Sequence, residues 1–149
     1  MAVLRKLSAS SVLLWGMVVV AGVYSVYLAA PQWLENEADP RSQEFLDKMA
    51  AEINRSVPVM IDKETELMPA AGAPGMLIYN YRLVNYSVAQ LDSSKFADGA
   101  KERLKQSACN RSETRDNFLK KGVTLRYSYF DKDKRHFATV DVAPSDCGF

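Results

Sequence analysis

The sequence contains a single histidine, His136, so catalysis of the Ser–His–Asp or Cys–His kind would have to use it. It directly follows the charged stretch Asp131–Arg135, which is typical of an exposed hairpin turn. No GxSxG or comparable nucleophile motif accompanies it. We therefore expect no catalytic residue and predict that the protein is not an enzyme. A hydrolase is the least favoured interpretation.

The same charged stretch resembles the beginning of a calcium-binding loop. Asp131 and Asp133 have the required spacing, but Lys134, Arg135 and His136 follow where oxygen ligands are needed. The glycine and glutamate of such a loop are also missing. The stretch is therefore interpreted as a solvated turn, and no metal site is expected.

Charge and glycine content exclude two further classes of ligand. The chain has 19 basic and 18 acidic residues, a net charge of +1, whereas a nucleic-acid partner calls for a strongly basic face. Gly72 and Gly75 form the only glycine cluster, which has the composition of a turn rather than of a phosphate-binding loop. We expect no nucleic acid and no cofactor.

The only two cysteines, Cys109 and Cys147, are predicted to form a disulfide. Both follow the predicted membrane segment described next, and an even pair in an oxidising compartment most simply forms one bond. A metal or redox pair is the alternative, but no CxxC spacing is present. The bond would attach the C-terminus to the end of a helix.

The run Val12–Ala30 has no charged residue and is long enough to cross a bilayer as one helix. Arg5 and Lys6 precede it, and the next basic residue is Arg41, so the positive-inside rule places the N-terminus in the cytoplasm. We predict a cytoplasmic N-terminus over 1–11, a transmembrane signal anchor over 12–30, a linker over 31–40, and an extracytoplasmic domain over 41–149.

A cleaved signal peptide is the alternative to this anchor. Its apolar region would be unusually long, and Tyr27 and Pro31 disfavour the nearest cleavage sites. Within the run, Ala21, Ser25 and Ala29 follow a small-xxx-small spacing, with Gly22 beside them. This spacing allows close approach of a second transmembrane helix, although it also recurs by chance.

Residues 41–149 show patterns of an α+β domain. Phe45, Met49 and Ile53 recur every four positions, which predicts a helix that begins after Asp39 and ends near Asn54. Alternating residues predict one hairpin from strands over 57–67 and 76–86, with a turn at 69–75, and a second hairpin from strands over 123–129 and 137–142. One helix capped at 92–94 and one short helix after Ser112 lie between them. We expect four antiparallel strands, with two to three helices on one face.

Aromatic residues gather on these two hairpins. Tyr79, Tyr81, Tyr127 and Tyr129 share the face expected to lie under the helices, although they could instead anchor a partner. The candidate partner surface is assigned to the remaining large side chains near them, which are Arg82, Tyr86, Arg126 and Phe130.

Several short motifs resemble a loosely defined group of small, mostly uncharacterised bacterial envelope proteins. They are Pro58-x-x-x-Asp62-x-x-Thr65-x-Leu67, Tyr79-x-Tyr81-x-Leu83, Cys109, Gly122-Val123 followed by Tyr127-x-Tyr129-x-Asp131, and Asp146-Cys147. One sheet with helices and a C-terminal cysteine pair is also similar to the plan of secretion pilotins and of small envelope inhibitors or immunity proteins. This resemblance implies a bacterial envelope location and binding rather than catalysis.

We therefore expect a protein of the bacterial inner membrane with a periplasmic domain. Its predicted role is an accessory, inhibitory or immunity partner of another membrane or periplasmic protein. The alternative is a small subunit of a membrane complex that contacts its partners through Ala21, Gly22, Ser25 and Ala29.

Overall fold

The computed structural model describes residues 38–149, and Ala38–Phe149 form one compact unit. The predicted cytoplasmic terminus, the anchor and its small residues Ala21, Gly22, Ser25 and Ala29 lie outside the described residues. Among residues 38–149, no helix is both long and apolar enough to cross a membrane. The domain boundaries therefore stay predictions.

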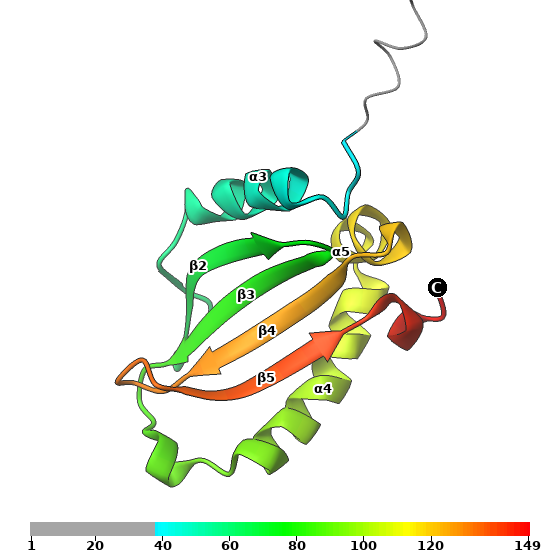
Figure 1. The fold of residues 1–149 in the computed structure, drawn as a ribbon. Helices are drawn as coiled ribbons and strands as arrows, with labels where there is room; N and C mark the ends of the chain where they lie inside the picture. The colour runs from blue at the N-terminus through cyan, green and yellow to red at the C-terminus, as the bar shows by residue number, and fades with distance from the viewer. Residues whose placement is uncertain (1–37) are drawn as a thin grey trace, which may run out of the picture. The chain divides into compact units, whose positions relative to one another are not determined.

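Three α-helices and one five-stranded sheet make up the described part of the chain (Figure 1). In chain order the elements are α3 (Gln43–Asn54), β1 (Val59–Met60), β2 (Thr65–Ala73), β3 (Met76–Leu83), α4 (Ser93–Asn110), α5 (Ser112–Asn117), β4 (Thr124–Phe130) and β5 (His136–Val142). Short 3₁₀ turns cover Val88–Gln90, Leu119–Lys121 and Pro144–Cys147. The α+β class is confirmed.

The predicted sheet of four antiparallel strands is wrong in one pairing and in the number of strands. The strand order is β1-β2-β3-β4-β5, and β3 pairs with β4 in parallel. A parallel pair needs a crossover of a dozen or more residues, and the segment with α4 and α5 supplies it. The two predicted hairpins are present, but they join edge to edge into one mixed sheet.

The first predicted strand is in fact two strands. β1 and β2 are separated by a turn in which the Asp62 carboxylate accepts hydrogen bonds from the N–H groups of Glu64 and Thr65, both at 2.8 Å. The stretch 69–75, expected to be a turn, mostly continues β2, with an irregularity in register between Met68 and Ala71. β1 lies at the edge of the sheet, as Pro58 predicts.

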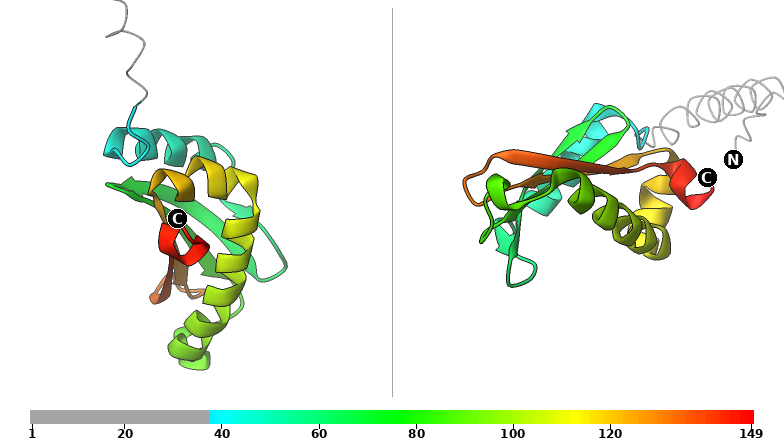
Figure 2. Two further views of the ribbon diagram at one scale, coloured as in Figure 1. Left: turned by 90° about the vertical axis from the view of Figure 1, so that its right-hand side faces the viewer. Right: turned by 90° about the horizontal axis from the view of Figure 1, so that it is seen from below.

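Strand register defines two faces of the sheet. Leu77 of β3 pairs with Leu125 of β4, which pairs with Val142 of β5, and all three side chains are fully buried under the helices. On this face Phe96 of α4 packs edge-on against Tyr129. Figure 2 shows α4 lying along one face of the sheet, next to β5. The other face, which we call the open face, carries Arg82, Arg126 and their neighbours.

Helix α3 packs on the same face at the other side of the sheet, against β2 (Figure 1). Its N-cap is Ser42, whose hydroxyl accepts from the Phe45 N–H at 3.2 Å, so the predicted start after Asp39 is three residues early. At its end, the Asn54 amide exchanges two hydrogen bonds with the Ala70 backbone. Between these points the backbone of α3 lies directly over Gly72 of β2.

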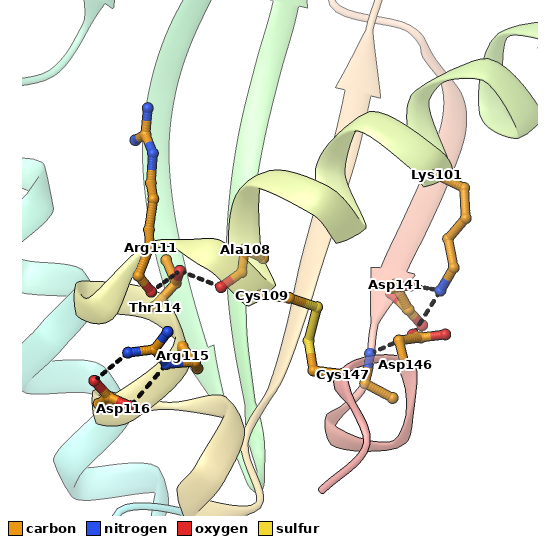
Figure 3. The surroundings of a disulfide bond; sticks show 11 residues. Lys101, Ala108, Cys109, Arg111, Thr114, Arg115, Asp116, Asp141, Asp146 and Cys147 are labelled. Carbon is orange, nitrogen blue, oxygen red and sulfur yellow. Dashed lines mark hydrogen bonds and ion pairs between the residues drawn. A yellow bond between two sulfur atoms is a disulfide. The ribbon is translucent and has the colours of Figure 1, made fainter.

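The predicted disulfide is present and holds the C-terminus (Figure 3). Cys109, in the last turn of α4, is bonded to Cys147 after β5. Lys101 of α4 also holds the C-terminal segment. Its ammonium donates to the Asp141 carbonyl and to the Asp146 carboxylate, the latter at 2.7 Å. The Lys101 hydrogen bond lowers the pKa of Asp146 below its usual value.

Candidate binding groove

The single histidine has no catalytic partner in the described part of the chain. His136 is exposed at the start of β5, and its Nε2 lies 2.8 Å from the Thr139 hydroxyl. The ring of Phe130 meets it edge to face at 5.5 Å. This arrangement supplies neither a nucleophile of raised reactivity nor a carboxylate that would orient the imidazole. That the protein is not an enzyme stays a prediction.

Asp131 is not a solvated turn residue as predicted, because its side chain is fully buried. Its carboxylate accepts hydrogen bonds of 2.9–3.0 Å from the N–H groups of Val88, Asp133 and Arg135 and from the Arg135 guanidinium. Burial raises the pKa of Asp131, but these donors outweigh it and lower the pKa to about 2. The carboxylate organises the β4–β5 turn, and no cluster of metal-ligating side chains occurs within residues 38–149.

The four hairpin tyrosines form a stacked ladder beneath the helices. Tyr79 stacks on Tyr127 with ring centroids 5.5 Å apart, and Tyr81 stacks on Tyr129 at the same distance. Tyr127 and Tyr129 are buried, whereas Tyr79 and Tyr81 are half-buried. The prediction that these side chains line the core is confirmed for Tyr127 and Tyr129, whereas Tyr79 and Tyr81 are partly buried and pack against that core.

The four residues of the predicted partner surface do not lie on one surface. Arg82 and Arg126 lie on the open face, where Arg82 pairs with Glu66 at 2.8 Å and Arg126 forms a bidentate pair with Asp141. Phe130, the register partner of Arg82, also lies there. Tyr86 lies apart from them, in the groove described next. Their role toward a partner stays a proposal.

A groove of about 600 Å³ opens on the helical side of the sheet. Its floor is formed by Tyr81 and Leu83 of β3 and Tyr129 of β4. One wall is α4, and the other is the β1–β2 turn. The two walls face each other because α4 packs against β5, whereas β1 lies at the opposite edge of the sheet. The α4 wall consists of Phe96, Ala100, Arg103, Leu104 and Ser107, and the turn wall of Ile61, Asp62, Glu64 and Thr65.

Tyr86 and Leu91, from the segment between β3 and α4, complete the groove. The Tyr86 hydroxyl donates to the Glu64 carboxylate at 3.0 Å, and this hydrogen bond raises the pKa of Tyr86. Val59, Met60 and Ile61 of the β1 segment are also 42–53% exposed, and Ile61 lines the groove. A concave site that combines apolar surface with polar side chains is a candidate binding site.

Sequence reasoning missed this groove because its walls come from segments far apart in the chain. The signal that was available was the run of three apolar residues beside Pro58, on a strand already assigned to the edge of the sheet. Exposed contiguous apolar residues on an edge strand are unusual unless something covers them.

The domain is similar in fold to three solved structures. A Pseudomonas aeruginosa protein thought to be secreted matches with a TM-score of 0.61 and 22% identity, over 70% of this chain and 91% of that one. The Vibrio vulnificus type 2 secretion pilotin EpsS matches with a TM-score of 0.57 and 9% identity, over 72% and 92%. The Vibrio cholerae type II secretion pilotin AspS matches with a TM-score of 0.53 and 13% identity, over 70% and 91%.

These identities are low, so the likeness defines the fold alone. No protein-family model matches the sequence, and the comparison with curated proteins finds no match. The fold is therefore the small α+β fold that also occurs in pilotins of type II secretion systems. The similarity to a pilotin plan, expected from the motifs, is confirmed at this level.

Proposed function

We propose that this protein is a membrane-anchored accessory protein that binds a segment of another envelope protein in the groove between α4 and the β1–β2 turn. The anchor is residues 12–30, in the bacterial inner membrane with the N-terminus in the cytoplasm. The domain extends into the periplasm, and the anchor confines its search for the partner to the membrane plane.

The observation that carries this proposal is the groove itself. Its floor joins two aromatic rings and a leucine, and its walls place charged groups at the edges. Aromatic anchors surrounded by a polar rim are the usual composition of protein interfaces.

Two further observations support the location and the class. A disulfide is retained in oxidising compartments such as the periplasm, and Cys109–Cys147 is bonded here. The same fold serves pilotins of type II secretion systems, and it occurs in a protein thought to be secreted. An inhibitory or immunity role remains within this proposal, because it uses the same kind of surface.

The open face is the less favoured surface. Arg82 and Arg126 are already held by carboxylates at 2.7–2.8 Å, so a partner would have to replace these pairs. Charged pairs that must be desolvated contribute little net affinity. The Phe130 ring is also already in edge-to-face contact with the His136 ring.

The experiment is a mild crosslinking pull-down of the tagged full-length protein from native membranes. Ser107→Trp places a bulky ring in the groove from an exposed position. Thr139→Trp places the same ring on the open face instead. Asp98→Trp, on the exposed side of α4, is the matched control. We expect one partner that Ser107→Trp loses and the other two variants retain. Loss with Thr139→Trp alone would transfer the interface to the open face and overturn the proposal.

A subunit that contacts its complex through the bilayer is the second candidate, favoured by the spacing of Ala21, Ser25 and Ala29. Replacing residues 12–30 with an unrelated anchor separates the two. The captured partner should persist if the groove binds it, and it should be lost if the transmembrane helix does.

A further inference from the structure

The two walls of the groove carry charges of opposite sign. Asp62 and Glu64 lie on the β1–β2 turn, and Arg103 lies on α4. Within residues 38–149 none of the three forms an ion pair, although Arg82 and Arg126 on the open face are both paired. The Arg103 Nε donates only to the Gly99 carbonyl at 3.2 Å, which leaves the end of the guanidinium available.

A second arginine, Arg111, lies outside the groove lining but near the tyrosine ladder. It is the residue that directly follows α4, where the backbone becomes extended. Burial raises the pKa of Tyr81, but the charge of Arg111 opposes that rise, as it does for Tyr127. The guanidinium is therefore close to the tyrosine ladder, and Figure 3 shows it directed away from Thr114.

The groove floor combines apolar surface with polar groups that are still available. The hydroxyls of Tyr81 and Tyr129 make no hydrogen bond to another described residue. No fully buried side-chain polar atom in this part of the chain lacks a partner, so both hydroxyls are at least partly accessible to solvent. An occupant therefore meets aromatic faces, with hydroxyls able to bind a peptide carbonyl or N–H.

We propose that the groove recognises a peptide segment in which a large apolar side chain lies between an acidic residue, facing Arg103, and a basic residue, facing Asp62 and Glu64. This inference rests on the proposed function and names the chemistry of its partner. A nucleic acid or another polyanion would be repelled by the turn wall, and a neutral apolar chain would leave all three charges unpaired.

The test uses the purified full-length protein in detergent and an array of immobilised synthetic peptides. Each peptide has a central Trp or Leu flanked, at varied spacing, by one Glu and one Lys, by two Glu or by two Lys. We expect the Glu–Lys peptides to bind best, and binding to fall with salt because the rim is exposed. Binding that is the same for all three classes would overturn the charge assignment and indicate a purely apolar ligand.

A charge swap tests the contact with Arg103 directly. Arg103→Glu should weaken binding of the Glu–Lys peptides by about five- to tenfold and strengthen binding of the Lys–Lys peptides. Lys132→Glu, in the exposed β4–β5 turn, is the matched control with the same change in net charge. Circular dichroism verifies that both variants keep the fold.

The outcomes separate this inference from the function on which it rests. A partner that Ser107→Trp loses, together with no effect of Arg103→Glu on either peptide class, would keep the groove as the binding site and refute the charge pattern. If Ser107→Trp changes nothing in the pull-down, the proposed function fails instead.

Discussion

Tyr81 of β3 and Tyr129 of β4 stack across the parallel strand pair, with ring centroids 5.5 Å apart and planes inclined by 26°. This contact and that of Tyr79 with Tyr127 lie across the β3–β4 pairing that joins the two hairpins into one sheet. Stacked aromatic pairs contribute about 0.5–1.5 kcal/mol each beyond their burial. Burial raises the pKa of both Tyr79 and Tyr129 to about 12.

These raised pKa values predict that the domain loses stability at alkaline pH. The unfolded chain ionises its tyrosines near pH 10, whereas the folded chain keeps Tyr79 and Tyr129 neutral until about 12. The stabilisation is therefore complete below pH 10 and is lost as the pH rises through 12. Tyrosinate absorbance and circular dichroism, recorded together during the titration, should show late ionisation that coincides with unfolding. Full ionisation near pH 10 with the fold intact would contradict the prediction.

The local parts of this fold could be predicted from the sequence, and the pairing of distant parts could not. The stripe through Phe96, Ala100 and Leu104 predicts α4. Gly122 ends the following helical segment with a φ of 82°, a conformation that glycine adopts readily. A hairpin depends on neighbours in the chain, but the pairing of β3 with β4 depends on how α4 returns the chain. Both hairpins expose an edge with alternating tyrosines, and nothing local specifies which edges meet.

The groove and the burial of Asp131 could not be predicted from the sequence for the same reason. Residues near 61, 86, 103 and 129 meet only after the sheet and α4 are assembled. Asp131 was assigned to solvent because its neighbours in sequence are charged, yet one of its donors is the N–H of Val88, 43 residues away.

Asp131→Asn should lower the thermal midpoint of unfolding by several degrees at neutral pH. An amide offers one acceptor oxygen to donors that now share two, and it places an NH₂ group against them. Because the pKa of Asp131 is lowered to about 2, its stabilisation is present at pH values above the unfolded pKa of about 4. It is lost as the pH falls from about 4 to 2, so the difference between variant and wild type should shrink over that range.

Differential scanning calorimetry at several pH values measures this difference. Asp133→Asn is the control, because Asp133 is exposed and its carboxylate contacts only Arg135, at 3.3 Å. An equal effect of the two substitutions would show that Asp131 has no special role in the turn.

Loss of the disulfide should destabilise the domain by about 4 kcal/mol. The bond joins residues 38 positions apart, and the chain-entropy model gives this value for a loop of that length. The double variant Cys109→Ser, Cys147→Ser should therefore unfold at lower denaturant concentration than the oxidised wild type. Reductant should shift the wild type to the same midpoint and leave the variant unchanged. If the unfolding midpoint of the wild type does not change with reductant, although thiol assays confirm that the disulfide is reduced, then Lys101 and Asp146 are sufficient to hold the C-terminus in place.

Gly72→Ala should destabilise the packing of α3 on β2, for a steric reason. A Cβ at this position would lie 2.6 Å from both the Leu46 carbonyl carbon and the Asp47 nitrogen, which belong to the helix backbone and cannot rotate away. Forcing an extra methyl group into such a contact costs about 1–3 kcal/mol. The Asn54–Ala70 hydrogen bonds, both shorter than 3 Å, resist the shift of α3 that would relieve the clash.

Gly99→Ala is the matched control, since the same atom is added to an exposed position of α4 with nothing within 4 Å of the new Cβ. It should stabilise the domain by up to about 1 kcal/mol, because alanine favours a helix over glycine. Chemical denaturation of both variants measures the two effects, which should be opposite in sign. The groove lies on the same face as Gly72 but at the opposite end of β2, beside α4. Peptide binding by Gly72→Ala should therefore survive wherever the variant remains folded. Loss of binding in the folded variant would mean that α3 shapes the groove through β2.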